Sequence, residues 1–146
     1  MTNYRERLWP APWLFIATAL VIPASLLVFV PIDVVVGAVV AVILYAGCCV
    51  GLLLASPVVE VTDRELVAGK ARLPRAFIGE AHAFSGDEAV LERGQRLDAR
   101  AWLLLRGWVQ PVVRVEVLDA DDPTPYWLIS TRNPSALIEA LGSARG

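Results

Sequence analysis

A long stretch with almost no charge constrains this chain more than any other feature. Between residues 8 and 59 the only charged side chain is Asp33, whereas charges return at ordinary density beyond residue 59. Neither half of this stretch has the polar stripe that a surface helix of a soluble protein needs. The remainder of the 146 residues is too short to bury both halves. We therefore expect lipid, not protein, to surround them.

Two segments of this stretch are long enough to cross a bilayer as helices. Residues 13–30 and 34–55 match the roughly 20 apolar residues that a membrane span requires. Pro23 removes a helical N–H and should kink the first span. Pro31 disfavours helix in the residue before it, and Asp33 is a good N-cap for the second helix. The sequence predicts a tight transmembrane helical hairpin over residues 13–55.

The basic residues predict on which side of the membrane the two ends of the chain lie. Arg5 and Arg7 precede the first span, and the turn between the spans has no positive residue. Four more basic residues follow the second span: Arg64, Lys70, Arg72 and Arg75. Because lysine and arginine are enriched in cytoplasmic loops, we expect both termini in the cytosol. A cleaved signal peptide fits less well, since a second span follows the first directly.

Small residues on the second span suggest a helix contact. Gly47 and Gly51, extended by Ala55, form one stripe that allows close approach of another backbone. We expect this stripe to pack against the first helix of the same chain. A homodimer or a protein partner docked on the second transmembrane helix is the alternative.

Beyond residue 56 the pattern changes from helical to alternating, which predicts strands. Ser85 to Glu88 matches a capping box and opens a short helix. Asn133 as N-cap, Pro134 at the first position and Gly142 as stop predict a C-terminal helix. The expected strands cover residues 58–62, 65–68, 77–84, 101–106, 112–118 and 126–131. The chain is thus divided into a cytosolic N-terminal tail (1–12), the transmembrane hairpin (13–55) and a β-rich α+β cytosolic domain (56–146).

No group of residues points to catalysis, a metal or a cofactor. His82 is the only histidine, whereas metal sites need several ligands and a Ser-His-acid triad would depend on it alone. Glycine-rich nucleotide-binding motifs are missing from the sequence. The net charge of −2 and a pI of about 5.4 argue against a nucleic-acid partner. Three aspartates followed by prolines predict a solvated turn: Asp119, Asp121 and Asp122.

Two features of the cytosolic part could meet the membrane. Lys70, Arg72 and Arg75 form a basic cluster that could contact anionic headgroups. The alternative is that these residues make no headgroup contact and only reflect the general enrichment of lysine and arginine on the cytosolic side of a membrane protein. Trp108 could enter the bilayer, anchor a partner or pack in the core.

Four stretches together resemble a family of small actinobacterial membrane proteins that is catalogued as a domain of unknown function. They are YRERLWP at 4–10, SPVVEV at 56–61, DARAWLLLR at 98–106 and DPTPYWLISTR at 122–132. The resemblance implies a bacterial plasma membrane location and the two-span layout. The ending at residues 129–141 also resembles the last strand and helix of bacterial pleckstrin-homology-like domains, which often follow a two-helix anchor. That fold has seven strands where we count about six, and the helix near Glu88 is an insertion.

These observations favour a non-enzymatic, membrane-anchored accessory or interaction module, with membrane lipid and a protein as its partners. One alternative is a structural subunit that packs into a larger membrane complex through Gly47 and Gly51. The other is a membrane enzyme acting on a lipid-linked substrate with Asp98, Arg100 and Arg106, which cluster in one stretch of the sequence.

Overall fold

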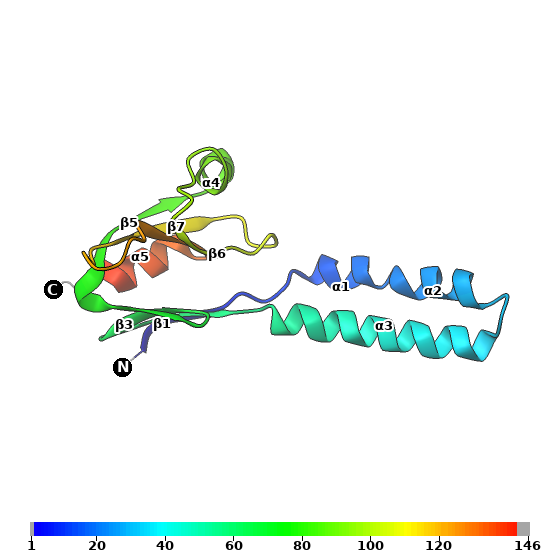
Figure 1. Cartoon of the computed structure of the whole chain (residues 1–146). Coiled ribbons are helices and arrows are strands. Elements are labelled where there is room, and N and C mark those ends of the chain that lie inside the picture. Colours follow the sequence, from blue (N-terminus) through cyan, green and yellow to red (C-terminus); the bar gives the residue numbers. More distant parts are fainter. Residues whose placement is uncertain (1, 143–146) are drawn as a thin grey trace. The chain divides into compact units, whose positions relative to one another are not determined.

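The computed structural model describes residues 2–142, which divide into two compact units (Figure 1). Residues 9–56 form a helical unit. The β-rich unit combines residues 2–8 with residues 57–142. The chain therefore starts in the β-rich unit, leaves it for the helices and returns, so the helical unit is an insertion within the β-rich unit.

The helical unit contains α1 (Pro12–Thr18), α2 (Val21–Phe29) and α3 (Val34–Leu54). Taken together, α1 and α2 give an apolar segment with a mean hydropathy of 2.1, and α3 gives one of 2.5. Both segments are long and apolar enough to cross a membrane. Only 6% and 11% of their residues are buried, whereas the core helix of a soluble protein is mostly buried.

The two signals that we identified in the sequence of the hairpin act as expected. The first span breaks between α1 and α2, where Ala19 O accepts a hydrogen bond from Ile22 N at 3.0 Å, a tighter turn than that of an α-helix. Pro23 has no N–H to give the regular bond to that carbonyl. Asp33 caps α3, since its Oδ1 accepts from Val35 N at 2.8 Å.

Close packing within the hairpin lies on a different pair of small residues from the predicted one. Gly37 and Ala41, one turn apart on α3, are buried. A Cβ on Gly37 would lie 3.4 Å from Phe29 Cβ, whereas a Cβ on Gly47 or Gly51 would meet nothing within 4 Å. The expectation that the Gly47 stripe packs against the first helix is therefore wrong. Helix α1 has no buried residue, and it is joined to α3 by the hydrogen bond that Tyr45 Oη donates to Phe15 O at 3.4 Å.

This difference predicts that leucine is tolerated at one glycine and not at the other. Gly37→Leu should destabilise the hairpin by about 1–3 kcal/mol, because a Cβ at this position already touches Phe29 and Leu26 and the leucine adds three more carbons. Gly47→Leu, a matched change on the same helix, should leave the monomer unaffected. Unfolding with increasing SDS in mild detergent measures both. Equal sensitivity of the two variants would contradict the packing described here.

The β-rich unit is built from two sheets, each of four strands. The first sheet is antiparallel throughout, in the order β1 (Thr2–Arg7), β2 (Val58–Thr62), β3 (Glu65–Ala68) and β4 (Ala71–Pro74). The second has the order β5 (Ile78–Phe84), β7 (Val112–Val117), β8 (Tyr126–Ser130) and β6 (Trp102–Leu104), and only β6 and β8 are parallel. Helices α4 (Gly86–Arg93) and α5 (Pro134–Gly142) and a 3-10 turn at Arg75–Phe77 complete the unit.

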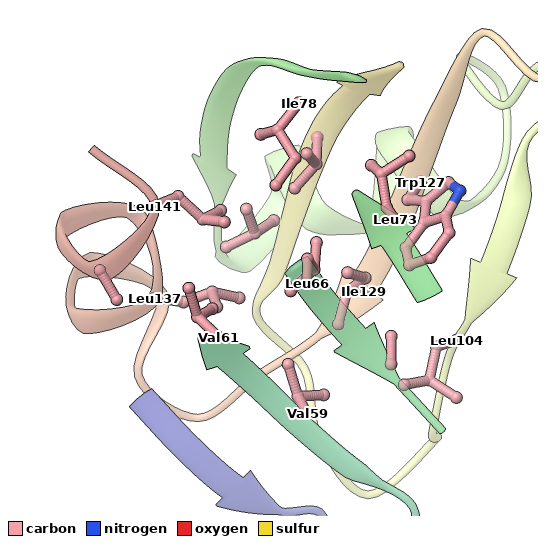
Figure 2. Close-up of a cluster of buried hydrophobic side chains, with 14 of the residues drawn as sticks. Val59, Val61, Leu66, Leu73, Ile78, Leu104, Trp127, Ile129, Leu137 and Leu141 are labelled. Atoms are coloured by element: carbon pink, nitrogen blue, oxygen red, sulfur yellow. The ribbon is translucent and has the colours of Figure 1, made fainter. Parts of the chain in front are cut away.

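The core lies between the sheets and against α5, as Figure 2 shows for the labelled side chains. Strand alternation explains which residues enter it: Val113 and Val115 of β7 are buried, whereas Glu116 is exposed. Leu137 and Leu141 place the apolar face of α5 on the same cluster. The other buried members include Val59, Val61, Leu66, Leu73, Ile78, Leu104, Trp127 and Ile129.

The six predicted strands and the C-terminal helix are present, with ends shifted by three residues or fewer. Two strands were missed. Residues 1–12 were predicted to be a tail, but Thr2–Arg7 is strand β1, paired with β2 from Arg7↔Val58 outward. Its polar sequence carries no alternating apolar signal, because most of its side chains are exposed. Strand β4 ends at Pro74, which a strand at the edge of a sheet tolerates because no neighbour needs its N–H.

Helix α4 starts where predicted, directly after Ser85. The side chain of Ser85, however, makes no capping hydrogen bond, so that part of the capping-box prediction is wrong. Gly86 adopts a φ of 56°, a left-handed conformation that glycine accepts without strain and that turns the chain from β5 into the helix.

Candidate functional site

Strand β1 carries a polar cluster centred on the carboxylate of Glu6. Tyr4 Oη donates to Glu6 Oε2 at 2.7 Å, and Thr131 Oγ1 donates to the same oxygen at 2.5 Å. The main-chain N–H of Arg132 donates to Glu6 Oε1 at 2.9 Å. Thr131 and Arg132 connect β8 to α5, so Glu6 joins the first residues of the chain to the start of its last helix. The sequence did not reveal this cluster, because Thr131 and Arg132 are more than a hundred positions away from Glu6.

The surroundings of Tyr4 favour its neutral form. Burial raises the pKa of Tyr4 from 10.0 to about 12, and the neighbouring Glu6 carboxylate adds to the rise, while the hydrogen bond with Thr131 opposes it. A folded-state pKa above the unfolded value means that the phenol stabilises the fold fully below pH 10. That contribution should be lost as the pH rises from 10 to about 12.

We therefore expect the stability of the protein to fall between pH 10 and 12, and Tyr4→Phe to reduce this fall because it removes the titrating group. Denaturant midpoints at pH 9 and pH 11.5 give the difference for the wild type and the variant. Tyr45 and Tyr126 are present in both proteins and cancel in the comparison. An identical alkaline loss in the variant would show that Tyr4 does not contribute.

Leu8 fixes the point at which the chain leaves the β-rich unit. Its side chain is fully buried, and its N–H donates to Pro57 O at 2.9 Å. Trp108 packs against the same core and donates from Nε1 to Leu8 O at 3.1 Å. Of the three roles considered for Trp108, the structure therefore supports core packing.

The three basic residues considered for headgroup contact do not form one patch. Lys70 is exposed in the turn between β3 and β4, and Arg72 pairs with Glu65 at 3.0 Å. Arg75 follows the opposite end of β4 and donates to the main-chain carbonyls of Thr62 and of Ala140, the latter at 3.1 Å. Arg75 thus joins β2 to the last turn of α5, and contact with headgroups remains a prediction for Lys70 and Arg72.

The residues considered for an enzyme on a lipid-linked substrate are separated. Arg100 bonds to Asp98 through side chain and main chain and lowers the pKa of that carboxyl. Asp98 N donates to the hydroxyl of Tyr126 at the start of β8, whereas Arg106 N donates to Ser130 Oγ at its end. A five-residue strand therefore lies between Arg106 and the other two.

A shallow cavity of about 260 Å³ lies between β5 and α5. His82 lines it and lies 3.3 Å from Glu80 Oε2, and both side chains are exposed. Within residues 2–142 no three His, Cys, Asp or Glu side chains gather closely enough to hold a metal ion. Asp119 and Asp122 accept hydrogen bonds from Asp121 N and Thr124 N, which confirms the predicted turn.

An ion pair with a buried carboxylate fastens α4 to the outer face of the second sheet. The Glu92 side chain is 2% exposed and lies 3.2 Å from Arg114 Nη1 and 3.7 Å from Arg96 Nη1. The Arg114 guanidinium also lies over the rings of Phe84 and Tyr126, at 5.2 and 5.6 Å from their centroids. This site was not predicted from the sequence, although the four-residue spacing of Glu92 and Arg96 is a signal for an ion pair on one helix face.

Comparison with known families identifies the chain. The family model of DUF3093, proteins of unknown function, matches residues 3–141. The chain belongs to the DUF3093 family. The match spans β1, the helical insertion and the β-rich unit up to α5. No curated protein and no solved structure matches it.

Proposed function

We propose that this DUF3093 chain is a two-span protein of the bacterial plasma membrane, with both termini in the cytosol, whose β-rich unit is a non-enzymatic interaction module. The observation that carries the proposal is the pairing of β1 with β2. These strands directly precede and follow the helical insertion and are neighbours in one sheet. A hairpin whose two ends return to the same sheet is consistent with ends on the same side of the membrane.

The distribution of charge supports the same orientation. Arg5 and Arg7 belong to the strand before the helices, and the basic residues after them belong to the same unit. The turn between α2 and α3 contains one charged residue, Asp33, which is acidic. Retention of lysine and arginine in the cytosol therefore favours one orientation of the whole chain.

The strand order supports a pleckstrin-homology-like fold for the β-rich unit. Once β1 is included, the first sheet has four antiparallel strands, and β5, β7 and β8 give the three of a second sheet. Helix α5 follows the last strand and packs on the core. The segment with α4 and β6 is then an insertion between β5 and β7. The seven strands of that fold are thereby accounted for.

An interaction role is also favoured by the way in which polar side chains are used. Glu6, Arg75 and Glu92 all bond to groups of the β-rich unit itself and secure its fold. Such side chains stabilise the module rather than present reactive groups to a substrate.

Crosslinking in living cells tests the proposal. A photo-crosslinking residue placed at exposed positions of the β-rich unit, such as Lys70 and Glu116, should trap one specific protein. The same residue at the buried Val113 is the control and should trap none. Reporter fusions at each terminus should be active only in their cytosolic form. A terminus that reports from outside the cell, or no specific adduct at any exposed position, contradicts the proposal.

A second candidate, a structural subunit of a larger membrane complex, is favoured by the open face at Gly47 and Gly51, where an added Cβ meets no atom of the chain. Another helix could approach this face closely. Native mass measurement after gentle extraction should then show a heteromer that Gly47→Leu dissociates. A monomer in both cases would exclude this candidate.

A further inference from the structure

Helix α1 is held less firmly than the segments on either side of it. None of its residues from Pro12 to Thr18 is buried, and Tyr45 of α3 donates one long hydrogen bond, 3.4 Å, to Phe15 O of α1. The helix is separated from α2 by a break at residues 19–20, which precedes Pro23. Four residues, 8–11, join it to β1. Breaks of this kind are where helices bend. Helix α1 is thus a short segment hinged at one end and tied to β1 at the other.

The geometry of the β1–β2 pair determines how a displacement of α1 would act. Strand β1 ends and β2 begins at the same end of the ladder, where Arg7 pairs with Val58. A pull at that end opens the ladder one pair at a time, beginning with the hydrogen bond from Leu8 N to Pro57 O. Stepwise opening requires less free energy at each step than separating all pairs together, and β1 is an edge strand with only one neighbour.

Leu8 and Glu6 are two of the side chains that hold β1 in place, and Glu6 reaches the residues before α5. Leu8 is fully buried next to the point of opening, and Glu6 bonds to Thr131 and to the N–H of Arg132. Thr131 Oγ1 in turn accepts from Asn133 N at 3.1 Å, and Asn133 O accepts from Leu137 N in the first turn of α5. Removing Glu6 therefore disturbs the residues that begin α5.

We propose that β1 is a latch that couples the first apolar helix to the start of α5. A displacement of α1 withdraws Leu8, unzips β1 from β2 and takes the Glu6 carboxylate away from Thr131 and Arg132. This inference goes beyond the proposed interaction role, because it concerns how a change in the helices reaches the opposite end of the chain. Coupling between α1 and α5 requires a continuous chain of contacts with two arrangements, one in which β1 is paired with β2 and one in which it is not.

Hydrogen exchange of the full chain in lipid nanodiscs tests the latch. Leu8→Ala should speed amide exchange about tenfold in residues 4–8 and in residues 131–137, because a truncated core leucine no longer holds the strand. Exchange in β7 should stay at the wild-type rate. Arg5→Ala, an exposed change on the same strand, is the matched control and should alter neither region.

A disulfide across the strands separates the latch from a general loss of stability. Arg5 faces Glu60 at a pair that does not exchange hydrogen bonds, since such pairs alternate from the bonded Leu8–Pro57 pair. Arg5→Cys with Glu60→Cys, in a background with Cys48→Ala and Cys49→Ala, should form a disulfide. When oxidised in the Leu8→Ala protein, it should restore slow exchange at residues 131–137, and reduction should abolish the rescue.

A substitution at the break between α1 and α2 tests the latch from within the helical unit. Pro23→Ala restores the missing helical N–H and should slow exchange at residues 4–8 about threefold or more, because a continuous helix restrains α1. Leu27→Ala, an exposed change in the same helix, should have no effect. The latch is overturned if Pro23→Ala leaves residues 4–8 unchanged, if Leu8→Ala leaves residues 131–137 unchanged, or if it speeds β7 equally.

Discussion

Replacing residues 9–56 with a Gly-Ser linker of about six residues should give a water-soluble domain that folds cooperatively, because flexible linkers of this length easily join neighbouring strands. Leu8 and Pro57, the two residues to be joined, are already connected by a hydrogen bond of 2.9 Å. The two parts of the β-rich unit form one compact unit, and helices α1–α3 belong to the other unit.

Residues 57–142 alone should not fold, even though they contain seven of the eight strands. Loss of Leu8 empties a fully buried position, and truncations of this kind cost about 2–5 kcal/mol. Loss of Glu6 leaves the buried hydroxyl of Thr131 without the carboxylate that accepts its hydrogen bond, which adds about 1–3 kcal/mol. The sum approaches the roughly 5–15 kcal/mol that holds an ordinary domain together.

Urea denaturation of the soluble domain, followed by circular dichroism, measures both effects. Leu8→Ala in the rejoined domain should lower the midpoint strongly, whereas Arg5→Ala on the same strand should leave it within about 0.5 kcal/mol of the parent, as exposed substitutions usually do. A cooperative transition in residues 57–142 with the midpoint of the rejoined domain would show that β1 is dispensable.

How far the sequence predicts this fold depends on whether an element carries its own signal. The nearly uncharged run, Asp33 and Pro23 act locally, so the helical hairpin and the break between α1 and α2 follow from the sequence alone. Strand β1 has no such signal, because its partner β2 lies beyond the whole insertion and most of its side chains are exposed. The Glu6 cluster depends on that pairing and was missed for the same reason.

The candidate surfaces show the same limit. Lys70, Arg72 and Arg75 are close in sequence, but the register of β3 and β4 places Arg75 at the opposite end of the strand from Lys70. Asp98 and Arg106 are likewise neighbours in sequence and are separated by the length of β8. Proximity along an extended chain does not predict proximity in a sheet, because each residue advances the strand by about 3.3 Å.

Removing Arg114 should cost more stability than removing Glu92, although the two form one ion pair. Arg114→Met leaves a carboxylate that is 2% exposed with Arg96, 3.7 Å away, as its remaining partner. Breaking a buried pair in this way costs about 3–5 kcal/mol. Glu92→Met leaves a guanidinium that is 35% exposed and lies over Phe84 and Tyr126, so water and the two rings can still stabilise its charge.

The double variant distinguishes an ion pair from simple packing. Glu92→Met with Arg114→Met removes both charges and fills similar volume, and such replacements are often about neutral relative to the intact pair, so the double variant should be more stable than Arg114→Met alone by about 3–5 kcal/mol. Denaturant midpoints of the four proteins give the coupling free energy between the two residues. Arg72→Met, which breaks the exposed pair with Glu65, is the control and should cost less than about 1 kcal/mol. Additive losses at Glu92 and Arg114 would mean that α4 is held by its apolar contacts and that the charges stabilise each other little.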